Sequence, residues 1–205
     1  MHAPVHRGHR RFVGETQWDV LAGDQPMDIE SYGAHYEAQT PINAPSDLVF
    51  EYLDDFEQLG AHMTRSSWMM AGSRMNYEFD DGKGRRVGSH VRLLGSFLGL
   101  KLEIDEQVIE RVHARSKTWQ TVGNPRMFIL AQYRMGFSLQ ALPRSCLVTA
   151  HIDYSLPTKG YRRLLGRLAG GVYARWCVRN VLDQAAGHFG NATEVAVRVQ
   201  ASKGS

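Results

Sequence analysis

The sequence is poor in cysteine, and its cysteines have no recognisable spacing. Cys146 and Cys177 form neither a CxxC motif nor the spacing of a zinc site. Two cysteines cannot cross-link a domain of this size, so their scarcity favours a reducing compartment, and we expect a cytoplasmic protein. Because metal-ligating residues do not cluster in the sequence, we also expect no metal and no redox cofactor.

Long apolar segments and a strong charge excess are missing as well. No uninterrupted apolar run approaches the roughly 18 residues of a membrane-spanning helix. The net charge is +3, far below the basic excess that binding to a phosphate backbone usually requires. We therefore expect no nucleic-acid partner.

What remains is the composition of one ordinary globular domain. The chain has 205 residues, of which 43% are hydrophobic and 22% charged, enough for a single core. We place this domain at residues 31–191. Residues 1–30 are basic and aperiodic, which predicts a poorly ordered arm, and residues 192–205 are expected to form a flexible tail.

Hydrophobic periodicity predicts the order of the elements. Alternation from Tyr32 to Ile42 predicts a half-buried strand, and Pro45 is placed to be the first residue of a helix. That segment is either one short helix or two helices joined near Asp54. Four to six strands follow up to Leu156, and the short turns between them predict antiparallel pairing.

A long helix is predicted after Pro157, from Thr158 to about Phe189. Its large apolar residues recur at helical spacing and form one stripe: Tyr161, Leu164, Leu165, Leu168, Val172 and Trp176. A curved sheet needs its concave face covered, and only this helix is long enough to cover it. We therefore expect the stripe to pack on the sheet.

The segment from Tyr36 to Met63, YEAQTPINAPSDLVFEYLDDFEQLGAHM, resembles the opening of a known superfamily. The residues that carry the resemblance are Ile42, Ala44, Pro45, Val49, Phe50, Leu53, Asp55, Phe56 and Glu57. They are similar to the first strand and paired helices of the START-like, or SRPBCC, superfamily, which includes the major birch pollen allergen, lipid-transfer START domains and polyketide cyclases. The resemblance implies an α+β helix-grip fold: a curved antiparallel sheet wrapped around a long C-terminal helix, with two short helices after the first strand.

The resemblance also implies a mostly apolar cavity for a hydrophobic small molecule, and methionines mixed with aromatic residues suit such a pocket. The predicted ligand-binding residues are Met69, Met75, Tyr77, Val91, Leu93, Trp119, Thr121, Tyr133, Met135, Tyr154, Leu168, Val172 and Trp176. The alternative is a filled core made of the same residues.

Two glutamates interrupt an apolar phase of the sheet. Glu106 and Glu110 fall in line with the strand residues that should face inward, where an unpaired carboxylate is costly. Arg175 and Arg179 lie on the same side of the last helix as its apolar stripe. These charges either meet as buried ion pairs or flank a polar head group. The alternative is that a bulge turns the glutamates outward and a kink at Gly170 turns the arginines to water.

Three functions fit these features. The first is a binding protein for a lipid, sterol-like or aromatic polyketide-like molecule. The second is an enzyme similar to polyketide cyclases or aromatases, with Glu106, Glu110, His62 and Tyr133 as its acid–base candidates. The third is a lipid carrier that docks on membranes, because every charge between Thr158 and Leu182 is positive. The apolar stripe favours a sheet-covering helix over membrane contact.

Overall fold

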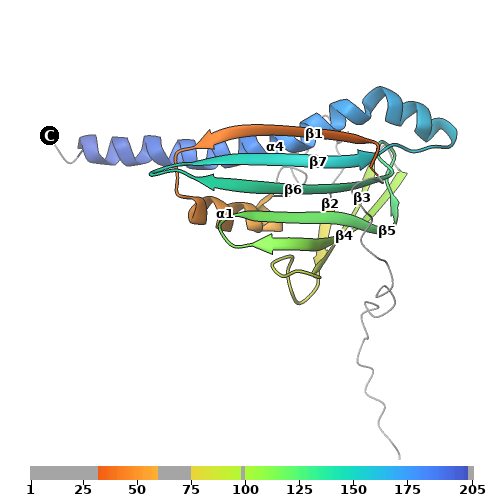
Figure 1. Cartoon of the computed structure of the whole chain (residues 1–205), viewed down its shortest axis with the longest axis horizontal. Helices are drawn as coiled ribbons and strands as arrows, with labels where there is room; N and C mark the ends of the chain where they lie inside the picture. The colour runs from red at the N-terminus through yellow and green to blue at the C-terminus, as the bar shows by residue number, and fades with distance from the viewer. Residues whose placement is uncertain (1–31, 60–74, 98–99, 203–205) are drawn as a thin grey trace, which may run out of the picture.

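The described residues form one curved sheet, two short helices and one long helix (Figure 1). The computed structural model describes residues 32–59, 75–97 and 100–202. The elements are β1 (Ala34–Ile42), α1 (Ser46–Asp54), α2 (Phe56–Leu59), β2 (Met75–Phe79), β3 (His90–Phe97), β4 (Leu100–Val112), β5 (Ser116–Arg126), β6 (Gln132–Ala141), β7 (Cys146–Ser155) and α4 (Gly160–Ser202). His62 and Met69, two of the predicted site residues, lie outside the described residues, as does the predicted N-terminal arm.

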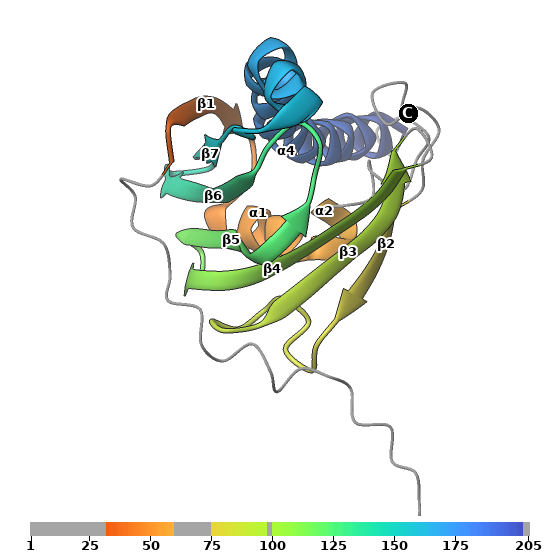
Figure 2. The ribbon, with the colours of Figure 1, turned by 90° about the vertical axis from the view of Figure 1, so that its right-hand side faces the viewer.

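The sheet is antiparallel throughout, with the strand order β1-β7-β6-β5-β4-β3-β2. The strands from β2 to β7 follow one another as a meander, and β1 joins the far edge beside β7. Figure 2 shows the sheet curving around α4, with α1 and α2 inside the curve of the sheet. The predicted helix-grip fold is confirmed.

The helical segment after β1 is two helices, the second of the two alternatives that the sequence left open. Pro45 precedes the first helix with φ −60° and ψ 149°, so α1 begins one residue later than predicted, at Ser46. The Asp55 carboxylate separates the helices, because it accepts a hydrogen bond from the backbone N–H of Glu57 at 2.9 Å. Val49, Phe50 and Leu53 then point into the core.

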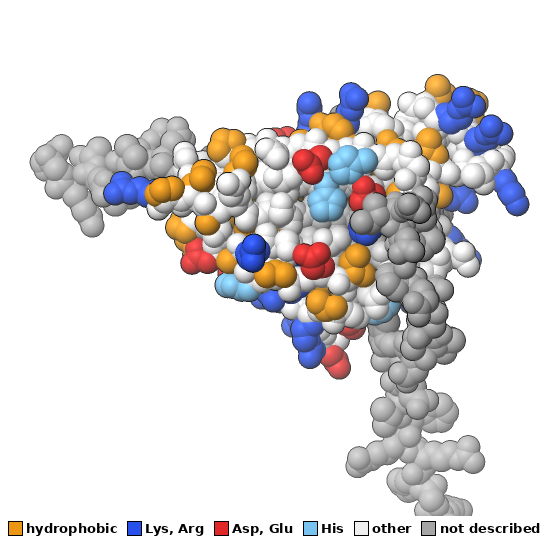
Figure 3. Space-filling view, viewed as in Figure 1, with side chains coloured by type: hydrophobic (Ala, Val, Ile, Leu, Met, Phe, Trp, Pro, Cys, Tyr) orange, Lys and Arg blue, Asp and Glu red, His pale blue; other side chains and the backbone are white. Residues whose placement is uncertain are grey.

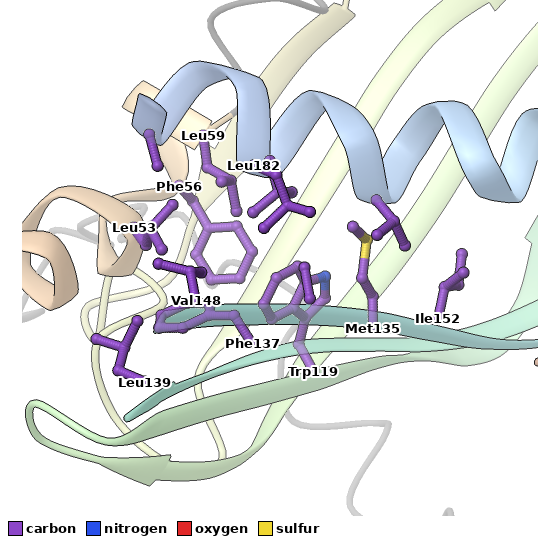
Figure 4. Close-up of a cluster of buried hydrophobic side chains, with 14 of the residues drawn as sticks. Leu53, Phe56, Leu59, Trp119, Met135, Phe137, Leu139, Val148, Ile152 and Leu182 are labelled. Atoms are coloured by element: carbon purple, nitrogen blue, oxygen red, sulfur yellow. The ribbon is translucent and has the colours of Figure 1, made fainter. Parts of the chain in front are cut away.

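The core lies between the concave face of the sheet and the helices (Figure 4). Phe56 of α2 packs edge-on against Trp119 of β5, with 5.2 Å between ring centroids. Figure 4 shows Met135 and Ile152 reaching from the strands toward α4, and Leu182 reaching back from the helix. Each such side chain contributes about 1.5 to 3 kcal/mol by leaving water, which holds α4 over the sheet.

The face that α4 turns to the sheet is not the predicted one. The stripe residues Leu168 and Val172 are 73% and 62% exposed, so the expectation that they line the interior is wrong. The inward face instead carries small residues. A Cβ added at Gly166 would lie 2.8 Å from Pro157 Cδ, and one added at Gly170 would lie 2.5 Å from Leu156 Cδ2. Only glycine permits this close approach. Because the glycine face of α4 packs on the sheet, the larger side chains on the other face point outward.

The bounds of α4 also differ from the prediction. The helix begins at Gly160, where φ is +62°, rather than directly after Thr158. It continues past Phe189 to Ser202. Residues 192–202 contain neither proline nor glycine, the two residues that disfavour a helix interior most strongly, so the sequence is compatible with this extension.

Candidate site around Glu106

Glu106 lies on the concave face of the sheet, inside the grip. It sits on β4, opposite Val91 of β3 and Thr121 of β5, and only 5% of its surface is exposed. Residues paired across an antiparallel ladder share a face, so Glu106 points the same way as these two buried neighbours.

Glu110 is exposed, although its position in the alternating pattern of β4 is the same as that of Glu106. The β4–β5 register shifts between Val108 and Glu110, and Glu110 is exposed and accepts a hydrogen bond from Ser116 Oγ at 2.7 Å. An irregularity of this kind changes which face a strand residue occupies. The predicted outward turn by a bulge therefore holds for Glu110 and not for Glu106.

Two side chains of neighbouring strands hold the Glu106 carboxyl. The Tyr133 hydroxyl of β6 donates a hydrogen bond to Glu106 Oε1, and the Trp119 side chain of β5 hydrogen bonds to the same carboxyl. Thr121 fixes Tyr133 in turn. Its Oγ1 accepts from the Tyr133 N–H at 3.1 Å and donates to the Tyr133 carbonyl at 3.2 Å. Within the described residues, the carboxyl is thus positioned by neutral donors rather than by a cation in direct contact.

Burial dominates the acid–base behaviour of this group. Desolvation raises the pKa of Glu106 to about 7, although the hydrogen bonds from Tyr133 and Trp119 and the charge of Lys117 act in the opposite direction. Burial, followed by the nearby Glu106, raises the pKa of Tyr133 well above its usual value. Near neutral pH, Glu106 can therefore either hold or release a proton, while Tyr133 remains a donor.

Three further polar groups face Glu106 from β2 and α4. The Tyr77 hydroxyl is buried and has no hydrogen-bond partner among the described residues, and burial together with Glu106 raises its pKa. On α4, the Tyr173 hydroxyl hydrogen bonds to the Cys177 sulfur. Burial raises the pKa of Cys177 to about 12, so it is a thiol at neutral pH. We call Tyr77, Glu106, Trp119, Tyr133, Tyr173 and Cys177 the Glu106 cluster.

The predicted arginine partners are not part of this cluster. Arg175 and Arg179 are exposed, and the Arg175 guanidinium lies 5.6 Å from the centre of the Tyr36 ring. Both arginines share the side of α4 that carries Leu168 and Val172. The inward packing of the glycines turns that entire side to solvent, which takes the arginines away from Glu106.

A second group of buried charges lies where the end of α1 meets β4 and β5. Lys117 Nζ of β5 is 2.9 Å from Asp54 Oδ1 of α1, donates to the Asp54 carbonyl at 2.7 Å and lies 4.0 Å from the centre of the Phe56 ring. Arg111 donates to the same carboxylate at 2.8 Å. Lys117 and Asp54 are each 1% exposed. Burial lowers the pKa of Lys117 to about 8.

The charges of this group contact one another: the Asp54 carboxylate is paired with both Lys117 and Arg111. Burial opposes ionisation of Asp54, but the hydrogen bonds from Arg111 and Lys117 prevail and lower the pKa of the carboxyl. We interpret the group as an anchor that ties the end of α1 to β4 and β5, and we assign it no binding role.

No metal site is evident in the described part of the chain, where His, Cys, Asp and Glu form no group of three or more that could hold an ion. Within the same residues, no helix is both long enough and apolar enough to cross a bilayer.

Comparisons with solved structures give matches at low sequence identity. The aromatase/cyclase Zhui from Streptomyces sp. R1128 superposes with a TM-score of 0.58 and 16% identity, over 78% of this chain and 95% of that chain. TTHA0849 from Thermus thermophilus superposes with a TM-score of 0.56 and 14% identity, over 78% of this chain and 99% of that chain. Ara h 8.0201 superposes with a TM-score of 0.52 and 10% identity, over 77% of this chain and 98% of that chain.

The chain has the helix-grip fold of the START-like superfamily. Identities this low show the fold alone. No protein-family model matches the sequence, and no curated protein sequence matches it either.

The helix-grip architecture brings most of the predicted strand residues to one face. Those that lie on the concave side are Tyr77, Val91, Leu93, Trp119, Thr121, Tyr133, Met135 and Tyr154. Met75 opens β2 opposite Gly95. From α4, Trp176 is partly buried and stacks on Tyr173, with 5.7 Å between ring centroids. Their contact with a ligand stays a prediction.

Tyr173 and Cys177 were missed by reasoning from the sequence. The signal that could have found them is the spacing of Gly166, Gly170, Tyr173 and Cys177, which recur at i, i+4, i+7 and i+11 on one helix face. Small residues at such spacing mark a helix face that packs closely. Tyr173 and Cys177 follow the two glycines on this face and point toward the concave side of the sheet.

Proposed function

We propose that this protein binds an apolar small molecule that carries a hydroxyl or keto group, between the concave face of the sheet and α4. Glu106 and Tyr133 are the polar anchor, and the apolar residues around them contact the body of the ligand. The observation that carries the proposal is the Glu106 cluster itself, a set of polar groups from β2, β4, β5, β6 and α4 that converge in an otherwise apolar interior.

The energetics of Glu106 support a binding role. A carboxyl in an apolar interior costs stability unless it is fully paired, and among the described residues this one meets hydroxyl and indole donors rather than a contacting cation. The Tyr77 hydroxyl is a second buried group whose hydrogen-bonding capacity is unused within the described residues. A ligand hydroxyl or carbonyl would satisfy such groups, and perturbed carboxyls of this kind concentrate at functional sites.

A matched pair of probes tests the binding proposal. Isothermal titration with naphthalene and 2-naphthol compares two apolar molecules that differ by one hydroxyl. We expect the hydroxylated probe to bind about tenfold more tightly, because one good hydrogen bond in a buried site contributes about 1.4 kcal/mol. Glu106→Met should remove this preference. Glu110→Met, on the same strand but exposed, should keep it.

The binding proposal fails if neither probe binds, or if the preference for 2-naphthol persists in Glu106→Met. A preference that both glutamate variants lose would place the anchor elsewhere on the protein.

Acid–base catalysis is the second candidate, and the pKa of Glu106 favours it. A carboxyl with a pKa near 7 is well matched to taking and returning a proton at neutral pH. The Tyr77 hydroxyl, whose proton has no acceptor among the described residues, could donate to a ligand oxygen. In an enolisation, the Glu106 carboxylate would take a proton from carbon beside a carbonyl and return it to the substrate. The reaction class is that of an aromatase/cyclase, which is what one protein of the same fold is named.

Deuterium exchange into a bound ketone separates this candidate from simple binding. With 2-tetralone in deuterated buffer, an enzyme should speed exchange beside the carbonyl as the pH rises through about 7, the pKa of Glu106. Glu106→Gln should abolish the acceleration. Exchange at the same rate in wild type and variant would leave binding as the function.

A further inference from the structure

An apolar stripe on the solvent side of α4 is not covered by any of the residues that the structure describes. It consists of Tyr161, Leu164, Leu165, Leu168 and Val172, whose exposed fractions run from 42% for Leu165 to 73% for Leu168. In Figure 3, hydrophobic and basic side chains gather together at the upper right, over the first part of α4. Singly exposed apolar residues are common, but a continuous patch of large ones marks an interaction surface.

The charges around this stripe are all of one sign. Between Thr158 and Leu182 the chain has six basic residues and no acidic one: Lys159, Arg162, Arg163, Arg167, Arg175 and Arg179. At 100° per residue, Arg162 and Arg167 flank the stripe on its two sides, while Arg175 and Arg179 continue its line after Val172. Arg175 and Arg179 are themselves exposed.

A hollow at the start of α4 adds a basic residue from the sheet. It has a volume of about 500 Å³ and its lining includes Arg126 of β5 together with Lys159 and Arg162, but no acidic residue. Cations from two elements therefore lie at the same end of the molecule as the stripe.

We propose that this outward face of α4 docks on an anionic phospholipid bilayer. The helix would lie in the membrane interface with the stripe among the acyl chains and the cations among the lipid phosphates. Charge decides between a membrane and a second copy of the chain. Two copies packed stripe to stripe would bring the same arginines together with no acidic residue of this segment to pair them. The proposal does not depend on the function proposed for the opposite face.

Vesicle sedimentation with matched variants tests the docking proposal. We expect the protein to pellet with vesicles of phosphatidylcholine containing about 30 mol% phosphatidylserine, and much less with pure phosphatidylcholine. Arg167→Gln with Arg179→Gln should weaken binding by about 30-fold, the product of two cations at a charged surface. Leu168→Ser with Val172→Ser should remove most of the remaining binding. All four positions are exposed, so the fold should survive, which circular dichroism can verify.

The matched controls are exposed residues elsewhere. Lys101→Gln with Arg144→Gln removes two cations, and Leu48→Ser with Val87→Ser removes two exposed apolar side chains, so both should bind vesicles like wild type. The proposal is overturned if the controls and the α4 variants behave alike, if neutral and anionic vesicles bind equally, or if no vesicle binds. A dimer in sedimentation equilibrium that only the Leu168 and Val172 change dissociates, without vesicle binding, would also overturn it and assign the stripe to a second copy.

Discussion

At the scale of single residues, Glu106 is buried and Glu110 is exposed, although the alternating pattern of the strand places both on the same face. A period of two predicts that Glu106 and Glu110 share a face, and the prediction fails at Glu110 because the register shifts after Val108. Sequence offers no reliable sign of such a shift. The environment of Glu106 could be predicted only in part, because Tyr133 comes to it from β6 through the fold rather than through sequence proximity.

The raised pKa of Glu106 makes stability depend on pH in a definite direction. The folded value of about 7 lies above the ordinary 4.5, so the folded protein holds this proton more tightly than the unfolded chain does. Stability contributed by this group is complete below about pH 4.5 and falls as the pH rises to about 7. The difference corresponds to about 3 kcal/mol.

Glu106→Gln should therefore gain stability relative to wild type as the pH rises. Urea unfolding at about pH 5 and about pH 8 should show the variant's relative free energy of unfolding increasing by up to about 3 kcal/mol. Parallel pH profiles for the two proteins would mean that Glu106 titrates as an ordinary surface carboxyl.

The buried pair of Asp54 and Lys117 makes a separate prediction. Asp54→Asn leaves the Lys117 ammonium buried without its counter-ion, which should cost about 3 to 5 kcal/mol in denaturant unfolding. Adding Lys117→Met to this variant should recover much of the loss, because the fully buried charge is then gone and the remaining cation, Arg111, is 23% exposed. The neighbouring Asp55→Asn is the matched control. Asp55 pairs with Arg85 at 3.1 Å near the surface, so its loss should cost at most about 1 kcal/mol. Equal losses at the two aspartates would contradict the anchor role.

At the scale of elements, α4 shows that the largest apolar residues of a helix need not form its packed face. The size and periodicity of the stripe from Tyr161 to Val172 predict that it packs in the core. The structure packs the face of Gly166 and Gly170 instead, because glycine lets the helix approach Pro157 and Leu156. A strand has two faces and alternation usually identifies the buried one, whereas this helix offers two packable faces.

Two glycine substitutions in the same helix test this packing. Gly187→Ala should stabilise by about 1 kcal/mol through helix propensity, since a Cβ there meets nothing within 4 Å. Gly166→Ala gains the same propensity, but its Cβ would lie 2.8 Å from Pro157 Cδ and 3.0 Å from the Ile129 carbonyl oxygen. We expect Gly166→Ala to be less stable than Gly187→Ala by about 1 to 3 kcal/mol in thermal or urea unfolding. Equal stabilisation by both alanines would place the glycine face in solvent.

At the scale of the whole molecule, the fold followed from the order of elements, whereas the site did not. Alternation, turns and the motif from Tyr36 to Met63 were enough to predict the helix grip. The site lies between the sheet and α4, so locating it required both the correct strand phase and the correct helix face. The strand half, with Trp119 and Tyr133, was predicted to face inward and does. The helix half, with Tyr173 and Cys177, was not predicted.

The two proposals use opposite faces of α4. The inward face carries Tyr173 and Cys177 toward Glu106, and the outward face carries the apolar stripe and its cations. Variants on one face should leave the other activity unchanged, so ligand and vesicle binding can be measured independently.

Methyl-labelled NMR can show whether an apolar molecule enters between the concave face of the sheet and α4. Titration with 2-naphthol should shift the methyl signals of Met135, Ile152 and Leu182 together, and the shifts should saturate at one probe per chain. The exposed Leu48 and Val87 should not move. Shifts confined to exposed methyls, or no saturable change at Met135 and Ile152, would contradict the account and leave the interior as a filled core.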